Sequence, residues 1–396
     1  MEIFKYNLSC NVLNYTNMRR LLCFFLLIIN ISVFGQKLTF SADILNSTDK
    51  DVKEIAAIWK NYFGLYASKN DTSMLHYWNE EEKKSNFTDI IKYALSPELP
   101  IYKTGNHVTF DIRKLDEEFY EIFTQFRFES DSDKNNILLI YRICAKKEHG
   151  EYKFYNAFYC NKQLLKSFSS GRINYYYPFS YPLDNKILRE TSNKTIATFE
   201  NIENYYHIKS NSPITYIFAN SIDECEAILG IPYTRLRSHF KSAGLSYSRT
   251  PCILLSCKPD HLHELTHALF IPLYPNAPSL FQEGIATYYG GTGSRDFAGN
   301  IALLKTYMHE NPAVNLADFD SNCILLNDGS NPFYTTGAVF IDSAIKVGGA
   351  EKALALFKYP NTNDGIYLAL KSELGIEKDK INLFLKEYVE NYKKEE

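Results

Sequence analysis

The chain has 396 residues, which is enough for two or three domains of about 150 residues each. Hydrophobic residues make up 45% and charged residues 22%, a balance that is typical of folded proteins and excludes wholesale disorder. The formal net charge is −3, so there is no basic surplus and a nucleic-acid partner is not expected.

The first 35 residues are predicted to be a targeting segment. Arg19 and Arg20 precede a mostly apolar run over 21–34, which is too short for a bilayer core that needs about 20 residues. A positive pair, a short apolar run and the small residue Gly35 are typical of a secretory signal, with Met18 as an alternative start. We expect cleavage at residue 35 and an exported protein (periplasmic, cell-surface or extracellular). An uncleaved membrane anchor is the alternative, and no later run is long enough to span a membrane.

Six cysteines follow this segment, an even number that permits disulfides in an exported protein. None of them forms a Cys-x-x-Cys pair, so a zinc site made of cysteines is not expected. Free buried cysteines are the alternative, and the sequence does not determine any pairing. The six are Cys144, Cys160, Cys225, Cys252, Cys257 and Cys323.

Residues 36–185 are predicted to form an α+β domain. Apolar residues recur at helical spacing over 50–67. The pattern then changes to strands, with alternation over 123–128, an apolar run over 137–144, and further alternation over 152–159 after a turn. A helix followed by a curved antiparallel sheet is faintly similar to the cone-shaped nuclear-transport-factor-like fold.

Residues 186–396 are predicted to form the second domain. Its first elements are a helix over 186–207 and a strand over 213–218, each with apolar residues at the matching spacing. A helix over 222–229 and a strand over 250–257 follow.

An H-E-x-x-H motif follows the last of these strands, from His263 to His267. Four residues advance a helix by about 400°, so the two histidines stand about 40° apart on one face. Their imidazoles can bind one Zn²⁺ at about 2.0–2.1 Å. Glu264 lies about 100° round the helix, where it can act on water as a general base. A pair of helix-face histidines without metal is the alternative.

A catalytic zinc takes three protein ligands and leaves one position for water. Glu283 is the candidate for the third ligand, on a predicted helix over 279–289 that follows His267 after a proline-containing loop. A carboxylate near a helix N-terminus that serves only the helix dipole is the alternative. The coincidence with the upstream motif favours the ligand.

The stretches HELTHALF and LFQEGIATYYGG resemble the gluzincin metallopeptidases, in the peptidase-MA-like group related to thermolysin and the zinc aminopeptidases. The resemblance covers about 186–396, where the helix–strand–helix–strand order is the one that the zincin fold uses. It implies a zincin-type domain with a largely helical C-terminal part. It also implies one zinc held by His263, His267 and Glu283, with Glu264 as the base.

Downstream, residues 332–342 resemble the aminopeptidase pattern Y-x-x-G, which implies that Tyr334 donates a hydrogen bond to the oxyanion. An ordinary core aromatic is the alternative. The stretch 243–247 lacks the glutamate of the G-x-M-E-N strand that binds a substrate amine, which favours endopeptidase over aminopeptidase action. Thr287 stands where the family tends to have an acidic partner for a ligating histidine. His261 is expected at the surface.

These patterns predict an exported zinc peptidase that hydrolyses a peptide or protein substrate with a zinc-activated water and Glu264 as general base. The alternative is an exported, non-catalytic binding protein. In that case the N-terminal domain would bind the partner and the zincin half would be a scaffold.

Overall fold

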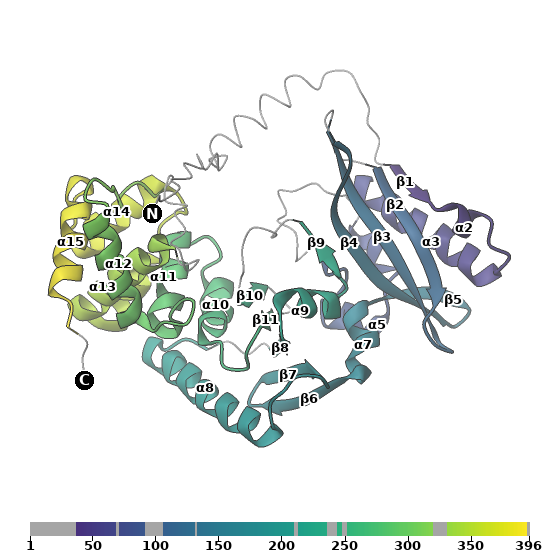
Figure 1. Cartoon of the computed structure of the whole chain (residues 1–396), viewed down its shortest axis with the longest axis horizontal. Helices are drawn as coiled ribbons and strands as arrows, with labels where there is room; N and C mark the ends of the chain where they lie inside the picture. The colour runs from purple at the N-terminus through teal and green to yellow at the C-terminus, as the bar shows by residue number, and fades with distance from the viewer. Residues whose placement is uncertain are drawn as a thin grey trace, which may run out of the picture. The chain divides into compact units, whose positions relative to one another are not determined.

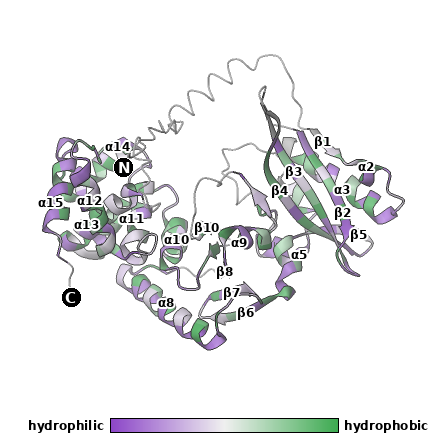
Figure 2. Ribbon diagram, in the orientation of Figure 1, coloured by the Kyte–Doolittle hydropathy of each residue, from purple (hydrophilic) through white to green (hydrophobic). Residues whose placement is uncertain are grey.

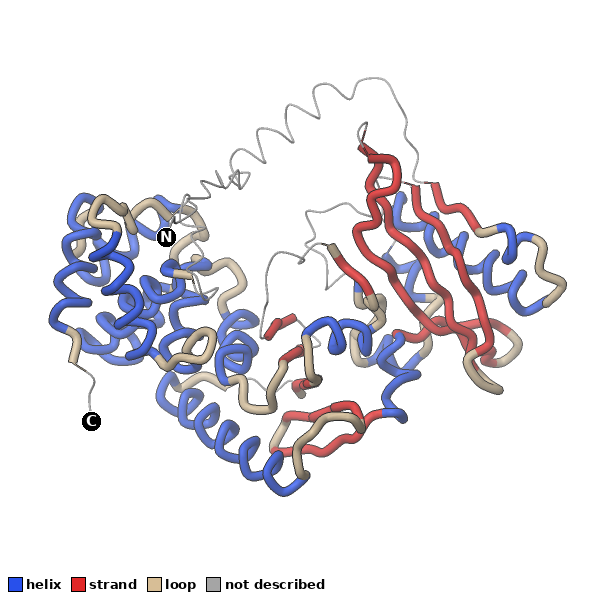
Figure 3. Tube along the Cα trace, viewed as in Figure 1, coloured by secondary structure: helices blue, strands red, loops and turns tan. Residues whose placement is uncertain are grey.

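The computed structural model describes residues 37–68, 71–91, 106–130, 133–209, 213–235, 244–247, 252–319 and 331–393 (Figure 1). The predicted targeting segment and Cys323 lie outside the described residues. The described chain is a mixture of helices and strands, with two sheets and a helical C-terminal part, as the α+β prediction required. Figure 3 shows the strands and helices along the chain.

The chain divides into two compact units. The β-rich unit combines the described residues from Lys37 to Glu200 with those of Lys209–Glu264 and contains both sheets. The helical unit combines Asn201–Ile208 with Leu265–Glu396. The chain passes from one unit to the other after Glu200, after Ile208 and after Glu264, and the last of these boundaries lies inside the helix Leu262–Leu273.

The first sheet of the β-rich unit has the strand order β1-β2-β3-β4-β5, and β9 also pairs with β4. β1 is parallel to β2, and the other neighbours are antiparallel. The strands predicted over 123–128 and 137–144 are confirmed as parts of β3 and β4. The strands are β1 (Lys37–Phe40), β2 (Asn106–Lys114), β3 (Phe119–Ser130), β4 (Asp133–Glu148), β5 (Glu151–Asn156) and β9 (Tyr233–Thr234).

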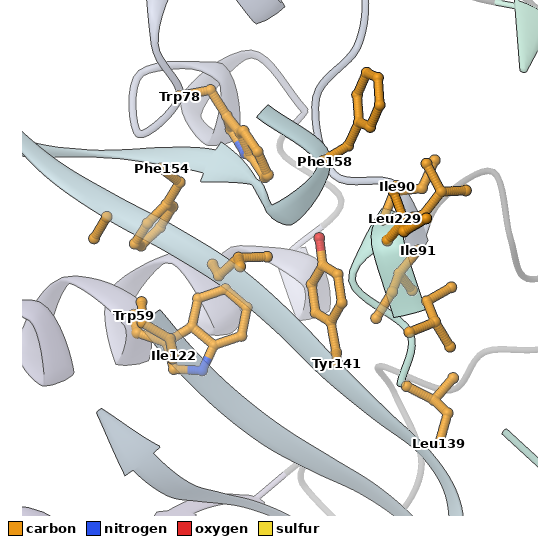
Figure 4. Close-up of a cluster of buried hydrophobic side chains, with 14 of the residues drawn as sticks. Trp59, Trp78, Ile90, Ile91, Ile122, Leu139, Tyr141, Phe154, Phe158 and Leu229 are labelled. Carbon is orange, nitrogen blue, oxygen red and sulfur yellow. The ribbon is translucent and has the colours of Figure 1, made fainter. Parts of the chain in front are cut away.

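The helix predicted over 50–67 is confirmed as α3 (Lys50–Ser68), and it packs against this sheet. Trp59 is buried on α3, and its indole N–H is shared between the Thr109 and Thr124 hydroxyls of β2 and β3, at 3.0 Å each. Figure 4 shows Trp59 among the aromatic and aliphatic side chains of this core. The shorter helices around α3 are α2 (Ala42–Leu45), α4 (Asp71–Leu75) and α5 (Glu80–Lys84).

The strand predicted over 152–159 is too long. β5 ends at Asn156, and the short helix α7 (Ala157–Asn161) follows. Asn156 is buried, and its backbone N–H and side-chain amide both donate to the Glu82 carboxylate, at 3.0–3.1 Å. The Asn79 amide donates to the same carboxylate at 2.6 Å. The bonds between Asn156 and Glu82, which lie 74 residues apart in the sequence, hold Asn156 at the junction. Burial raises the pKa of Glu82 to about 8, against the opposing effect of the hydrogen bonds.

The second sheet of the β-rich unit has the order β10-β11-β8-β7-β6. β8 lies between parallel β7 and β11, and β10 is an antiparallel edge strand. All five residues of β11 are buried, as expected for an inner strand of this kind. The strands predicted over 213–218 and 250–257 are thereby confirmed. They are β6 (Leu165–Ser170), β7 (Ile173–Pro178), β8 (Ile214–Phe218), β10 (Gly244–Tyr247) and β11 (Cys252–Ser256).

Two predicted helices follow strands of this sheet in the sequence, one after β7 and one after β8. The first is α8 (Asn185–Tyr206), whose hydrophobic residues are interleaved with hydrophilic ones in Figure 2. The second is α9 (Ile222–Leu229), which begins after Ser221, whose hydroxyl accepts from the Glu224 N–H at 3.1 Å. It ends at Gly230, whose φ of 106° suits the left-handed cap of a helix.

The helical unit follows in sequence. α13 is broken by Gly348 and Gly349, whose backbone angles are not helical. None of the described helices combines the length and apolar character that a bilayer crossing requires. The helices are α10 (Leu262–Leu273), which begins in the β-rich unit, α11 (Ser279–Gly290), α12 (Phe297–Glu310), α13 (Pro332–Leu356), α14 (Asn363–Leu374) and α15 (Ile381–Asn391).

Candidate metal centre

The H-E-x-x-H motif lies on α10, as its spacing predicts. One side of the helix is apolar, with Leu265 and Leu269 fully buried. The motif residues are nearly buried too, since His263, Glu264 and His267 are only 6–7% exposed. Burying three ionisable side chains together on one short helix is costly unless they have a common partner.

Glu283 lies on α11, and its side chain is about a quarter exposed. Its Oε2 lies 3.3 Å from Nε2 of His267, and both residues belong to the helical unit. His263 lies one turn before His267 on the continuous helix α10. One potential ligand atom from each of the three residues lies within 4.8 Å of the other two. The structure therefore brings together the three residues that the sequence predicts as ligands.

One spacing in this cluster, between His267 and Glu283, matches the geometry of a bound zinc ion. Tetrahedral coordination with bonds of about 2.0–2.2 Å places neighbouring ligand atoms about 3.3–3.6 Å apart. The 3.3 Å between His267 and Glu283 lies in this range. A histidine–carboxylate ion pair has a similar length, but an ion pair does not require a second histidine to converge on it. Two imidazoles and one carboxylate form the donor set of a catalytic zinc site with one open position.

A group of aromatic side chains packs between the two helices that carry the predicted ligands. Tyr206, at the end of α8, contacts Phe270 of α10 edge-on, with ring centroids 5.2 Å apart. Tyr206 also lies against Tyr289 of α11, whose hydroxyl donates to the Tyr206 hydroxyl at 3.2 Å. Burial raises the pKa of both phenols, that of Tyr289 to about 12, so both are neutral at physiological pH. Neutral, well-packed side chains of this kind can fix the position of α10 relative to α11.

The helices α11 and α13 touch through two glycines. A Cβ built on Gly337 would lie 2.1 Å from the Leu280 carbonyl oxygen and 2.9 Å from Cα of Gly284. A Cβ built on Gly284 would lie 2.4 Å from the Gly337 carbonyl carbon. The backbones approach this closely only because neither residue has a side chain. Gly284 is next to Glu283 in the chain, so this crossing lies beside the third predicted ligand.

Tyr334 lies on the first turn of α13 and is partly exposed. Pro332 opens the helix, and the Asn331 side chain caps it by accepting from the Phe333 N–H at 2.9 Å. Tyr334 is one turn before Gly337, so Tyr334 and Glu283 flank the same helix crossing. Its contact with an oxyanion stays a prediction.

The expectation that His261 lies at the surface is wrong, because the residue is only 9% exposed. α10 begins at Leu262, so His261 precedes the helix and does not follow its phase. Its Nδ1 lies 3.0 Å from the Ser256 hydroxyl, and its backbone N–H donates to the Tyr216 hydroxyl at 3.2 Å. These contacts lie within the β-rich unit.

The edge strand β10 covers both His261 and the predicted base. A Cβ built on Gly244 would lie 2.4 Å from the His261 ring and 2.6 Å from Cγ of Glu264. The backbone of β10 therefore lies directly against the Glu264 side chain. These contacts are not predicted by the sequence, whose signal there is one glycine in a short strand, and such a signal is too weak to predict them.

Thr287 is fully buried one turn after Glu283. Its hydroxyl has no hydrogen-bond partner in the part of the chain that the structure describes. The described contacts therefore do not show Thr287 replacing the acidic partner of a ligating histidine.

Comparison with known proteins adds little. No family model matches the chain, and no curated protein matches it. An M1 zinc metallopeptidase from Deinococcus radiodurans is a solved structure with slight similarity, at a TM-score of 0.35 and 12% sequence identity. The match covers 72% of this chain and 63% of that chain, so it spans less than two thirds of the other protein. Similarity at this level does not establish a common fold, and the function is inferred from the residues of the site.

Proposed function

We propose that the chain is a zinc-dependent peptidase that cleaves peptide bonds within an extended substrate. The observation that carries this proposal is the convergence of His263, His267 and Glu283, with Glu264 beside them and outside the ligand set. Zinc, when bound there, supplies a Lewis acid that polarises the scissile carbonyl and makes water more acidic.

Glu264 is the residue that moves the proton. Its carboxylate takes a proton from the attacking water, whose oxygen forms the new bond to the carbonyl carbon. It then delivers this proton to the amide nitrogen, so that the C–N bond breaks and the amine leaves uncharged. The contact with β10 restricts the side chain to one region of the site, which limits the reorganisation that each transfer requires.

Tyr334 is proposed as an additional donor to the oxyanion. The Asn331 cap holds the backbone at the start of α13, and the glycine crossing one turn away restricts how α13 can move. A preorganised donor of this kind stabilises the charge that develops on the carbonyl oxygen.

The sequence of the stretch 243–247 favours an internal cleavage site, because it lacks the glutamate with which the zinc aminopeptidases hold a substrate amine. The four described residues of β10 include no acidic side chain that could hold a free substrate amine. We therefore propose that the substrate is not held by its N-terminus.

The test compares Glu264→Gln with His309→Ala. His309 is an exposed histidine that pairs with Glu390, so its loss should change neither metal content nor activity. We expect wild type to contain one zinc per chain and to cleave internally quenched peptides and unfolded protein. Glu264→Gln should keep the zinc and lose at least about 100-fold in kcat, because general acid–base catalysis contributes about 10²–10⁴-fold.

A Glu264→Gln variant with full activity would contradict the role of the base. A wild-type protein with stoichiometric zinc and no turnover of any unfolded substrate would favour the alternative, an exported binding protein on a metallopeptidase scaffold.

A further inference from the structure

Two of the cysteines that the proposed function does not use lie together in the β-rich unit. Cys144 is on β4, in register opposite Tyr155 of β5. Cys160 is on α7, which follows β5 directly. Both are buried, at 1% and 3% exposure, in one small cluster with Phe119 and Tyr155.

The two cysteines share this small cluster, in which Cys144 of β4 and Cys160 of α7 pack with the rings of Phe119 and Tyr155. The neighbouring Cys144 thiol and burial both raise the pKa of Cys160. Cys225 has different neighbours, since its thiol contacts the Ser256 and Ile217 carbonyl oxygens at 3.3 and 3.7 Å. All five described cysteines are free thiols in this structure.

We propose that Cys144 and Cys160 form a disulfide when the chain folds in an oxidising compartment. The bond would link β4 to α7 across the β4–β5 hairpin, in a cluster whose other members are aromatic. The proposal concerns the β-rich unit alone and is independent of the metal centre.

The oxidant is a disulfide of low molecular weight, such as oxidised glutathione. One protein thiolate attacks it, which forms a mixed disulfide and releases one glutathione thiolate. The second protein thiolate then attacks the mixed disulfide at the protein sulfur and releases the second glutathione. Two protein thiols and one oxidised glutathione become one protein disulfide and two reduced glutathiones. Because both thiols are buried in the folded chain, the exchange must occur during folding.

The test is refolding of the full chain from denaturant with a mixture of reduced and oxidised glutathione. Free thiols are then alkylated in denaturant, and the unreduced protein is digested with trypsin. Cys144 and Cys160 fall in the separate tryptic peptides 143–146 and 154–162. We expect these two peptides to be linked, and the link to disappear with dithiothreitol. Alkylation of both cysteines, or a link from either one to Cys225 or Cys257, would overturn the proposal.

A second measurement uses thermal unfolding with and without reductant. Opening a loop of this length should lower the Tm of wild type by about 5–10 °C. The double variant Cys144→Ser with Cys160→Ser should not respond to reductant. Cys257→Ser is the control, because Cys257 is only partly buried and outside the pair, and it should respond as wild type does. An equal response of wild type and the double variant would overturn the proposal.

Discussion

A single methyl group at the crossing of α11 and α13 should damage catalysis while sparing the metal. In Gly337→Ala the new Cβ would lie 2.1 Å from the Leu280 carbonyl oxygen. Cβ atoms essentially never approach other heavy atoms closer than 3.0 Å, so the helices must separate locally by about 0.9 Å. The obstacle is the backbone of α11, and it cannot rotate away as a side chain could.

This displacement should lower both the free energy of unfolding and the catalytic rate, by different amounts. Overpacking of a buried contact typically costs about 1–3 kcal/mol in the free energy of unfolding. The shift also moves Tyr334, one turn earlier on α13, relative to Glu283, and a misplacement of about 1 Å in an active site can cost about 100-fold in rate. Zinc should remain, because all three predicted ligands are on α10 and α11.

The assay measures kcat, zinc per chain and the thermal unfolding midpoint of Gly337→Ala. Gly64→Ala is the matched control, because a Cβ on Gly64 of α3 meets no atom within 4 Å. Alanine there should be neutral or stabilise the helix by up to about 1 kcal/mol. A Gly337→Ala variant with wild-type kcat and wild-type unfolding would show that the glycine crossing does not position the site.

Three further predictions follow. Tyr334→Phe should lower kcat by about 10²–10³ with zinc content and KM little changed, and a kcat within about threefold of wild type would return Tyr334 to an ordinary aromatic. Folding raises the pKa of Glu82 from 4.5 to about 8. The contribution of protonated Glu82 to the free energy of unfolding is therefore complete below pH 4.5 and is lost as the pH rises to 8. In urea unfolding, the free energy of unfolding of wild type should therefore fall by up to about 1.4 kcal/mol per pH unit more than that of Glu82→Gln across this window. Equal slopes of this free energy against pH would refute the raised pKa of Glu82. Export should remove the leader at Gly35, which mass spectrometry of the processed protein can check, and a retained N-terminus in the cytoplasm would contradict it.

The parts of the site that the sequence predicts are those set by local geometry. The four-residue spacing of His263 and His267 determines their common face as soon as a helix forms. The apolar spacing over 50–67 likewise predicts α3 to within a residue. In both cases the periodicity of a single helix is enough to predict which residues share one of its faces.

The predictions that are wrong fail because of contacts between residues that are distant in the sequence. The alternating pattern over 152–159 continues past Asn156, but the chain turns there because a buried carboxylate 74 residues earlier binds Asn156. His261 is expected at the surface, yet the helix begins one residue later and β10 covers the side chain. Contacts between residues distant in sequence leave no periodic signal, so the glycine crossing at Gly337 could not be predicted either.

The most direct test of the metal centre is anomalous diffraction at the zinc absorption edge, from crystals of protein grown with zinc and purified without chelators. We expect one strong peak per chain, about 2.0–2.2 Å from a nitrogen of His263, a nitrogen of His267 and a carboxylate oxygen of Glu283. Crystals without a peak at these three residues, or with zinc bound only elsewhere on the chain, would contradict the proposed metal centre and the peptidase function that depends on it.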